Sequence, residues 1–269
     1  IKMVLISGAI LIAEFIIAYK IPYMQVYGIG QFTYEIVCFA ILINTAYENR
    51  KKLKLNISLD KKEKAIIIIS LLVGTVTALI CCISNPKYIL PYNGEEEIGN
   101  LYFNADVHRG VKDLTTYDYT IHEIHPLYRF ANLILFLPIA LLNIVFKVFK
   151  INNINIMYMN SYICLIVQII YNAISALLIY KILKNIKLKE NTRFFGSLMF
   201  IFSLPFIWLS ILPETYSITL LALLFMIYFY INKNNIWMAF AILALGLNFM
   251  VALPIGIIIL HILVNNIKK

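Results

Sequence analysis

The chain has 269 residues, of which 61% are hydrophobic and 14% charged, and its mean hydropathy is +0.82. A soluble domain has roughly 45–50% apolar residues, so this composition excludes a soluble enzyme. The formal charge of +9 does not indicate nucleic-acid binding, because Lys and Arg gather in the cytoplasmic loops of membrane proteins. Long uncharged runs such as 65–86 fit helices rather than a barrel, so we expect an all-α, polytopic transmembrane helix bundle.

The N-terminal part, residues 1–64, is predicted to form two additional transmembrane helices at about 3–19 and 27–47, followed by a basic loop. The first stretch contains Glu14 and lacks a small-residue cleavage site, so we interpret it as a retained helix. The segment 48–64 has seven basic residues against three acidic ones, which by the positive-inside rule makes it cytoplasmic. The chain does not begin with Met, which we interpret as a trimmed or partial chain.

The run 65–86 then carries the chain outward, so the loop 87–125 is expected to be extracytoplasmic. This loop contains seven of the fourteen acidic residues and three of the four histidines. It is also longer than a simple connection between neighbouring helices needs to be. We therefore expect the function of the protein to lie in this loop.

The next apolar stretch, 126–146, is expected to be re-entrant or interfacial rather than a full crossing. The basic segment 181–193 should be cytoplasmic, and one full crossing at 126–146 would put it on the wrong side. The stretch is also short and interrupted by Pro138. The run 157–180 would then cross inward and the run 194–212 outward.

The turn at Pro213 and Glu214 is accordingly predicted to be external, on the same side as the acidic loop. The run 215–232 would return to the cytoplasm. The last apolar stretch, 236–264, is too long for one perpendicular crossing and has basic residues at both ends, so we expect a break at 246–254 between two short helices. A single tilted helix is the alternative. The four cysteines fall inside apolar runs and are interpreted as small core residues without disulfides.

Several reactive residue types converge in the external loop. If 104–113 is helical, Asp106, Arg109 and Asp113 share one face at spacings of three and seven residues. The alternative is a solvated, salt-bridged helix. His122 and His125 have a spacing that can ligate a metal together with Asp106 or His108, although the proline after His125 weakens this interpretation. A divalent metal bound by Asp106 therefore stays an option, and a dedicated all-protein cage is disfavoured.

A second acidic candidate follows a run without charge. Glu214 lies directly after Pro213, close to the predicted hydrocarbon region, where acidic residues are usually functional. The alternative is a carboxylate at the water interface that ends one helix or caps the next.

With these residues placed, the chain resembles the GT-C superfamily of membrane glycosyltransferases, in particular the protein O-mannosyltransferases and the aminoarabinose transferase of lipid A. In that branch an Asp-Glu-x-x-Tyr-like motif and a Lys-Pro-Pro-Leu-like motif follow the first outward helix of the core. Here the stretches 106–109 (Asp-Val-His-Arg) and 125–128 (His-Pro-Leu-Tyr) stand in those places. Residues 211–221 and 244–254 continue the resemblance, which covers roughly 65–264.

The resemblance implies a division into residues 1–64 and a GT-C-like core at 65–269, from which the family's C-terminal part is absent. It implies catalytic roles for Asp106 and Glu214. Substrate binding is assigned to Arg109, Lys112, Asp113, His122, His125 and Tyr128.

The implied enzyme is a glycosyltransferase in the plasma (inner) membrane with an extracytoplasmic active site. It would move a sugar from a polyprenyl-phosphate donor to a hydroxyl of a lipid, glycan or protein acceptor, with inversion. Two other interpretations remain open: a transporter or flippase of lipid-linked sugars, and a polymerase or ligase of surface polysaccharide.

Overall fold

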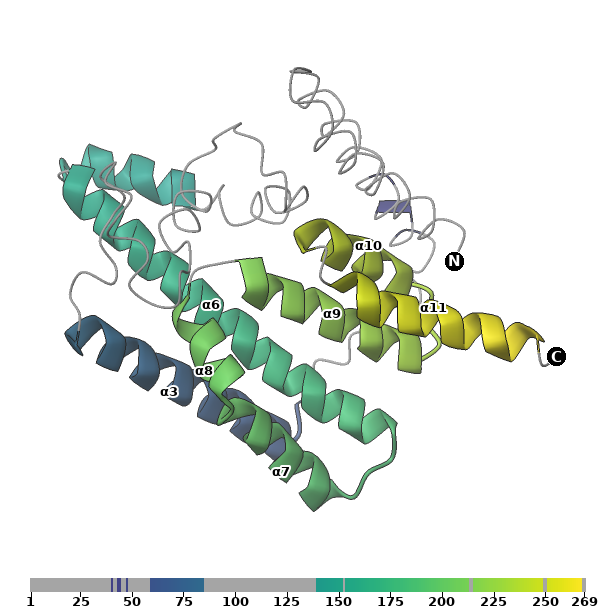
Figure 1. The fold of residues 1–269 in the computed structure, drawn as a ribbon. Helices are drawn as coiled ribbons and strands as arrows, with labels where there is room; N and C mark the ends of the chain where they lie inside the picture. The colour runs from purple at the N-terminus through teal and green to yellow at the C-terminus, as the bar shows by residue number, and fades with distance from the viewer. Residues whose placement is uncertain are drawn as a thin grey trace. The chain divides into compact units, whose positions relative to one another are not determined.

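The structure is a computed structural model that describes residues 59–84, 139–151, 153–212, 215–248 and 251–267, together with Ala40, Ile43, Asn44 and Tyr47. The regular elements in these ranges are helices, and no strand occurs among them, as an all-α fold requires. The helices are α3 (Lys61–Ser84), α6 (Asn153–Asn185), α7 (Glu190–Ile201), α8 (Leu204–Ile211), α9 (Thr215–Ile231), α10 (Trp237–Leu247) and α11 (Ala252–Ile267) (Figure 1).

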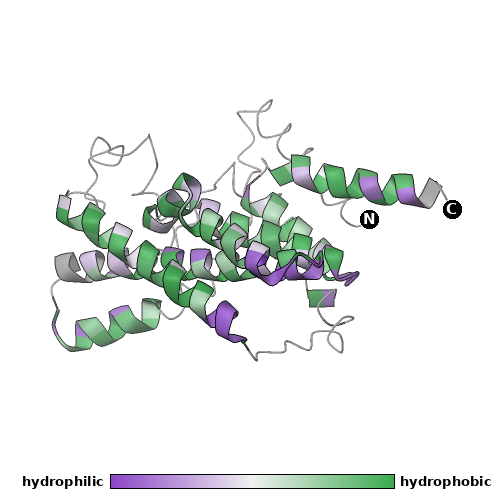
Figure 2. Cartoon of the chain, turned by 90° about the horizontal axis from the view of Figure 1, so that it is seen from below, coloured by the Kyte–Doolittle hydropathy of each residue, from purple (hydrophilic) through white to green (hydrophobic). Residues whose placement is uncertain are grey.

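Among the described residues, two helices are long and apolar enough to cross a membrane: α3, and α6 over Tyr158–Asn185. Helices α7 and α8 meet the same criterion only as a pair, so the candidate spans number two or three in this part of the chain. Figure 2 shows hydrophobic residues along most of these helices. The protein therefore has the helices of an integral membrane protein, as its composition predicts.

Helix α3 shows how such a helix fits a bilayer. One face carries large apolar side chains that are more than half exposed, namely Ile68, Leu72, Val76, Leu79, Ile80 and Ile83. The other face is buried and carries Ile66 and the small residues Ser70, Gly74 and Ala78. An exposed apolar face is costly in water but not against lipid tails, whereas small residues let neighbouring helices approach closely.

The chain divides into two compact units. One unit comprises Ile57–Tyr119 and Arg129–Leu221; the other comprises Ile1–Asn56, Thr120–Tyr128 and Ala222–Lys269. The first unit contains α3, α6, α7 and α8, and it holds most of the features discussed below. The division at residue 64 that the resemblance implies stays a prediction.

In the unit that contains α3, the helices α6, α7 and α8 all pack against α3 and against one another. Two groups of buried apolar side chains join them: Ile66, Ala176, Tyr180, Ile201 and Phe206 form one, and Ala78, Leu165, Ile169, Ile211 and Leu212 form the other. Each group draws on at least three helices, so these four helices form one bundle.

The run 194–212, for which we expect an outward crossing, divides into α7 and α8 at a bend of 53°. Ser203 is the N-cap of α8, and its side chain accepts a hydrogen bond from the backbone N–H of Phe206 at 3.4 Å. Pro205 lies at the start of α8; within a continuous helix its ring would clash with the carbonyl of Ile201. The proline and the serine cap together explain the bend.

The predicted break in the last apolar stretch is confirmed. Helix α10 ends at Leu247 and α11 begins at Ala252, within the expected range 246–254. The single tilted helix is therefore wrong. Helix α9 also matches the expected run 215–232 closely.

The expected re-entrant stretch 126–146 is described only from residue 139, where a short apolar helix runs from Ile139 to Val148. The loop 87–125 and the two N-terminal helices lie outside the described residues, apart from the four residues named above.

Candidate functional site

The site residues predicted from the sequence all lie outside the described part of the chain. They are Asp106, Arg109, Lys112, Asp113, His122, His125, Tyr128 and Glu214. The structure therefore does not test whether these residues come together. No group of three His, Cys, Asp or Glu side chains that could hold a metal ion occurs within the described residues. The metal at Asp106 stays a prediction.

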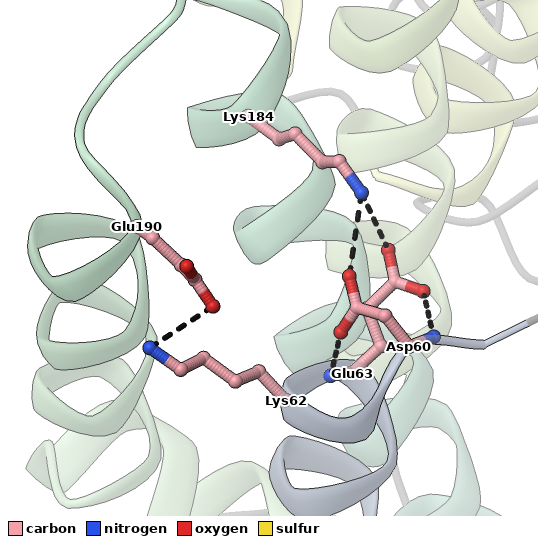
Figure 3. A network of polar contacts seen from close by, with 5 residues as sticks. All are labelled: Asp60, Lys62, Glu63, Lys184 and Glu190. Carbon is pink, nitrogen blue, oxygen red and sulfur yellow. Dashed lines mark hydrogen bonds and ion pairs between the residues drawn. The ribbon is translucent and has the colours of Figure 1, made fainter.

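A network of charged side chains joins α3, α6 and α7 at one end of their bundle (Figure 3). Asp60 and Glu63 cap the start of α3 reciprocally: Asp60 Oδ1 accepts from the Glu63 N–H at 2.8 Å, and Glu63 Oε2 accepts from the Asp60 N–H at 3.1 Å. Lys184 of α6 lies 3.3 Å from Asp60 Oδ2 and 3.7 Å from Glu63 Oε1. Lys62 pairs with Glu190 of α7 at 3.0 Å. The network ties three helices together.

The electrostatics of the network favour its ionised form. Partial burial by itself raises the pKa of Asp60. The hydrogen bond from the Glu63 N–H and the Lys184 ammonium lower the pKa by more than burial raises it, so it lies below its ordinary value of 3.8. The side chain of Glu63 is only 5% exposed, and Lys184 supplies its cation. Since every member of the network is paired, we assign it a structural role.

A second polar feature lies in the interior of the same bundle, on α6. Ser161, Gln168, Asn172 and Ser175 are all at most 1% exposed, although α6 is a candidate membrane span. At 100° per residue these four positions fall within about 60° of one another around the helix. Asn160, which is 6% exposed, lies about 60° from the nearest of them around the helix and about 120° from Asn172. Polar side chains buried in a membrane helix are costly and are therefore usually functional.

The buried hydroxyl groups on these helices have local partners. Ser175 donates to the Tyr171 carbonyl at 2.9 Å, Ser210 of α8 donates to the Phe206 carbonyl at 2.8 Å, and Thr219 of α9 donates to the Thr215 carbonyl at 2.7 Å. Hydroxyls that bond back to their own helix are a common structural arrangement. These residues need no ligand to explain them.

The buried side-chain amides differ from the hydroxyls, and Asn172 shows why. Its Nδ2 donates to Ser210 Oγ at 3.0 Å. Ser210 in turn donates to the Phe206 carbonyl, so in this arrangement Ser210 accepts from Asn172. The Oδ1 of Asn172 is thereby turned away from Ser210, and it has no hydrogen-bond partner among the described residues.

The same holds for two further amide oxygens on α6. Asn160 Oδ1 and Gln168 Oε1 are also buried and have no hydrogen-bond partner. We call Asn160, Gln168 and Asn172 the amide stripe. A buried acceptor without a donor costs about 1–3 kcal/mol, so three on one helix need an explanation such as a bound ligand or water.

The oxygens of the amide stripe can act only as hydrogen-bond acceptors. Its three oxygens accept hydrogen bonds from hydroxyl, amide or water groups, and they carry no charge. From Tyr158 to Tyr180, α6 contains no charged side chain or histidine, and the same is true of α8. The stripe can therefore accept hydrogen bonds from neutral hydroxyl or amide groups.

Sequence reasoning missed the amide stripe because it concentrated on acids and histidines. The signal that could have found it is the spacing of Asn160, Gln168 and Asn172 at eight and four residues within the apolar run 157–180. An apolar span has no intrinsic need for amides at such intervals.

The other unit contains a separate polar contact. His261 of α11 lies between Tyr230 of α9, whose hydroxyl bonds its Nδ1, and Asn265, whose Nδ2 lies 3.0 Å from its Nε2. Tyr230 also packs edge-on against Trp237 of α10. Both ring nitrogens of His261 are engaged, so in this arrangement the histidine joins α9 to α11 and has no nitrogen left for a metal.

Comparison with known proteins does not extend the resemblance: no family model, curated protein or solved structure matches the chain significantly. The sequence and the structure therefore define the class to which the protein belongs, an integral helical membrane protein with a buried uncharged polar face on α6.

Proposed function

We propose that the protein is a membrane glycosyltransferase that transfers a sugar from a polyprenyl-phosphate donor to an acceptor hydroxyl on the extracytoplasmic face. Two lines of argument support the proposal. One is the resemblance carried by the external loop and by Glu214. The other is the amide stripe, and the second carries more weight because it rests on the described structure.

The observation that carries the proposal is the orientation of Asn172. Its amide hydrogens face Ser210, and its buried oxygen meets no donor in the part of the chain that the structure describes. A lipid tail offers no hydrogen-bond donor, whereas a sugar offers several hydroxyl donors on a compact ring. A lipid-linked sugar carries hydroxyl donors of this kind at the head of a lipid that remains in the bilayer.

The transfer step would be a single displacement at the anomeric carbon. The acceptor oxygen forms a bond to this carbon, the bond to the phosphate oxygen breaks, and the configuration inverts. Asp106 would take the proton of the acceptor hydroxyl, and polyprenyl phosphate would leave with the electron pair. Arg109 and His125 would offset the charge on the leaving phosphate.

The remaining predicted residues would complete this site. Glu214 would contribute a carboxylate from the second external loop. Lys112, Asp113, His122 and Tyr128 would contact donor or acceptor. A divalent cation held by Asp106 would take part in binding the phosphate and take the place of base catalysis by this residue.

The test is donor consumption by purified full-length protein in lipid nanodiscs. We would incubate wild type and Asp106→Asn with a panel of polyprenyl-phosphate sugars, with and without divalent metal. We expect wild type to release polyprenyl phosphate from at least one donor and the variant to lose this activity while keeping its expression level. Retained transfer by Asp106→Asn would disprove the proposed base, and no release from any donor would disprove the enzyme.

A transporter or flippase of lipid-linked sugars is the second candidate, and one observation favours it. Two interrupted helix pairs, α7 with α8 and α10 with α11, are typical of transporters, in which broken helices line the substrate site. The two functions differ in the fate of the donor. A flippase would move intact donor between leaflets of a vesicle, whereas the proposed enzyme would separate the sugar from its phosphate.

A further inference from the structure

We propose that the end of the bundle at which α3 begins and α6 ends binds the headgroups of anionic phospholipids. The binding surface consists of four exposed lysines, which we call the lysine surface: Lys61, Lys64, Lys187 and Lys189. The inference is independent of the proposed function, because the positive-inside rule puts this end in the cytoplasmic leaflet and the transfer residues are expected on the other side.

The first step of the argument is the charge at this end of the bundle. The described residues 59–64 and 181–193 contain eight basic side chains and three acidic ones. The three acids, Asp60, Glu63 and Glu190, each pair with a lysine of the network in Figure 3. The ammonium groups of the lysine surface make no ion pair or hydrogen bond within the described part of the chain. Their charge is therefore available to an anion of the surrounding leaflet.

The second step places two of these lysines on the lipid-facing side of α3. At 100° per residue, Lys61 and Lys64 lie within about 40° of Ile68, the first exposed apolar side chain of this helix. Lys64 precedes Ile68 by about 6 Å along the helix axis. A phospholipid whose tails lie against the apolar face would thus have its phosphate near the level of both lysines. Membrane insertion favours basic residues in cytoplasmic loops, but it does not require them on the lipid-facing side of a helix.

The third step adds the connection between α6 and α7. Lys187 and Lys189 alternate there with two exposed apolar side chains, of which Ile186 is 50% exposed. The boundary between water and lipid accommodates such a mixture of basic and apolar groups, whereas water alone does not favour it. The ion pair between Lys62 and Glu190, at 3.0 Å, joins the start of α7 to the start of α3. Both pairs of lysines therefore lie at the same end of the bundle.

Lys187 allows a test that keeps the fold. It follows α6 in a left-handed conformation, with φ 63°, and its N–H donates to the Lys184 carbonyl at 3.0 Å. Glycine is favoured in this helix-ending motif, so Lys187→Gly should remove the charge without a loss of stability. Lys150 has the same conformation, with φ 56°, and its N–H donates to the Lys147 carbonyl at 2.9 Å, but it precedes the other end of α6. Lys150→Gly is therefore the matched control.

The experiment uses full-length protein purified in a neutral detergent. The probes are phosphatidylglycerol and phosphatidylcholine with identical acyl chains, and glycerol phosphate as a soluble anion. Native mass spectrometry counts the bound lipid, and the shift in unfolding temperature caused by each probe is measured at low and high salt. The variants are Lys187→Gly, the double substitution Lys61→Gln with Lys64→Gln, and the control Lys150→Gly.

We expect wild type at low salt to bind phosphatidylglycerol about tenfold or more tightly than phosphatidylcholine, because a lysine near an anionic headgroup contributes up to about fivefold in affinity. High salt should remove most of this preference. Lys187→Gly should reduce the preference by up to about fivefold, and the double substitution should reduce it further. Without lipid, Lys187→Gly should unfold at no lower temperature than wild type. Lys150→Gly should keep the preference of wild type.

Equal affinity of wild type for the two lipids would overturn the inference, and so would an unchanged preference in the double variant. An equal loss in Lys150→Gly and Lys187→Gly would show a general effect of charge rather than a surface at this end. Competition by glycerol phosphate as strong as that by phosphatidylglycerol would assign the site to a soluble anion instead. These measurements follow lipid binding and not sugar transfer, so failure of the proposed enzyme would leave them unaffected.

Discussion

Lys184 and Asp60 form an ion pair of 3.3 Å that joins the two basic segments of the chain, 48–64 and 181–193. Because the start of α3 thus lies beside the end of α6, these helices run antiparallel. The end of α3 and the start of α6, which the stretch 85–152 connects, therefore lie together at the other end of this helix pair. This finding agrees with the prediction that 126–146 is not a single full crossing, since one crossing would separate the two basic segments.

The reciprocal cap between Asp60 and Glu63 should make the start of α3 sensitive to mutation. Asp60→Ala removes a side-chain acceptor for the Glu63 N–H and is expected to cost about 1 kcal/mol of unfolding free energy. Asp60→Asn keeps an acceptor for this N–H and should lose less. Reversible chemical denaturation in detergent measures both values, and equal losses would show that the cap is not the source of the effect.

The same residue predicts a pH dependence. The pKa of Asp60 is lower in the folded protein than its ordinary value of 3.8, so folding favours the ionised form. Its stabilisation is complete above the unfolded pKa and is lost as the pH falls through the folded pKa. Wild type should therefore lose more stability than Asp60→Asn between pH 5 and about pH 2, the acidic range in which carboxylates titrate. Parallel stability curves for the two proteins would contradict this assignment.

The two lysines of the network should differ in importance. Lys184→Met leaves the 5% exposed carboxylate of Glu63 without its cation and should cost about 1–3 kcal/mol. Lys62→Met breaks a pair with Glu190, whose side chain is 55% exposed, and should cost less than about 1 kcal/mol. Unfolding of both variants at low and high salt would test the ranking, and a larger loss for Lys62→Met would reverse it.

Gly74 is predicted to tolerate a side chain poorly. A Cβ at this position would lie 3.0 Å from Ile169 Cγ2 and 3.5 Å from Ser210 Oγ, where α3 meets α6 and α8. Gly74→Ala should therefore destabilise the bundle by about 1–3 kcal/mol. Gly256→Ala is the control: nothing lies within 4 Å of its Cβ, so better helix propensity should raise stability by up to about 1 kcal/mol.

The topology predicts that position 214 faces the outside. Glu214→Cys, in a background in which the four native cysteines are replaced by alanine, should react with a membrane-impermeant thiol reagent added to intact cells. Lys187→Cys in the same background should react only after the membrane is opened. The reverse labelling pattern would invert the whole orientation.

Much of the fold could be predicted because the length of an apolar run and the charge of a loop can both be read from neighbouring residues in the sequence. The uncharged runs indicated α3, α6 and α9, and the excess length of 236–264 indicated the break between Leu247 and Ala252. The bend between α7 and α8 was missed although Pro205 was visible, because a proline near a helix start is compatible with either a straight or a bent path.

The candidate site was harder to predict than the fold. Gln168 and Asn172 are plain in the sequence, but whether their amides are satisfied depends on α8, which lies about forty positions further along. Hydrogen-bond satisfaction is a property of packing, and residue type alone does not reveal it. The acids and histidines of the loop 87–125 were easier to select because charge in an apolar chain is visible without any structure.

The bend at Ser203 and Pro205 also has a mechanical consequence. Ser210 lies beyond the bend, on the short arm α8, whereas Asn172 lies on the continuous helix α6. Any straightening of the arm relative to α7 would pull the serine hydroxyl away and release the Asn172 amide to rotate. The bent path of α7 and α8 therefore sets where Ser210 stands beside α6, and with it the side of Asn172 that meets a hydrogen-bond acceptor.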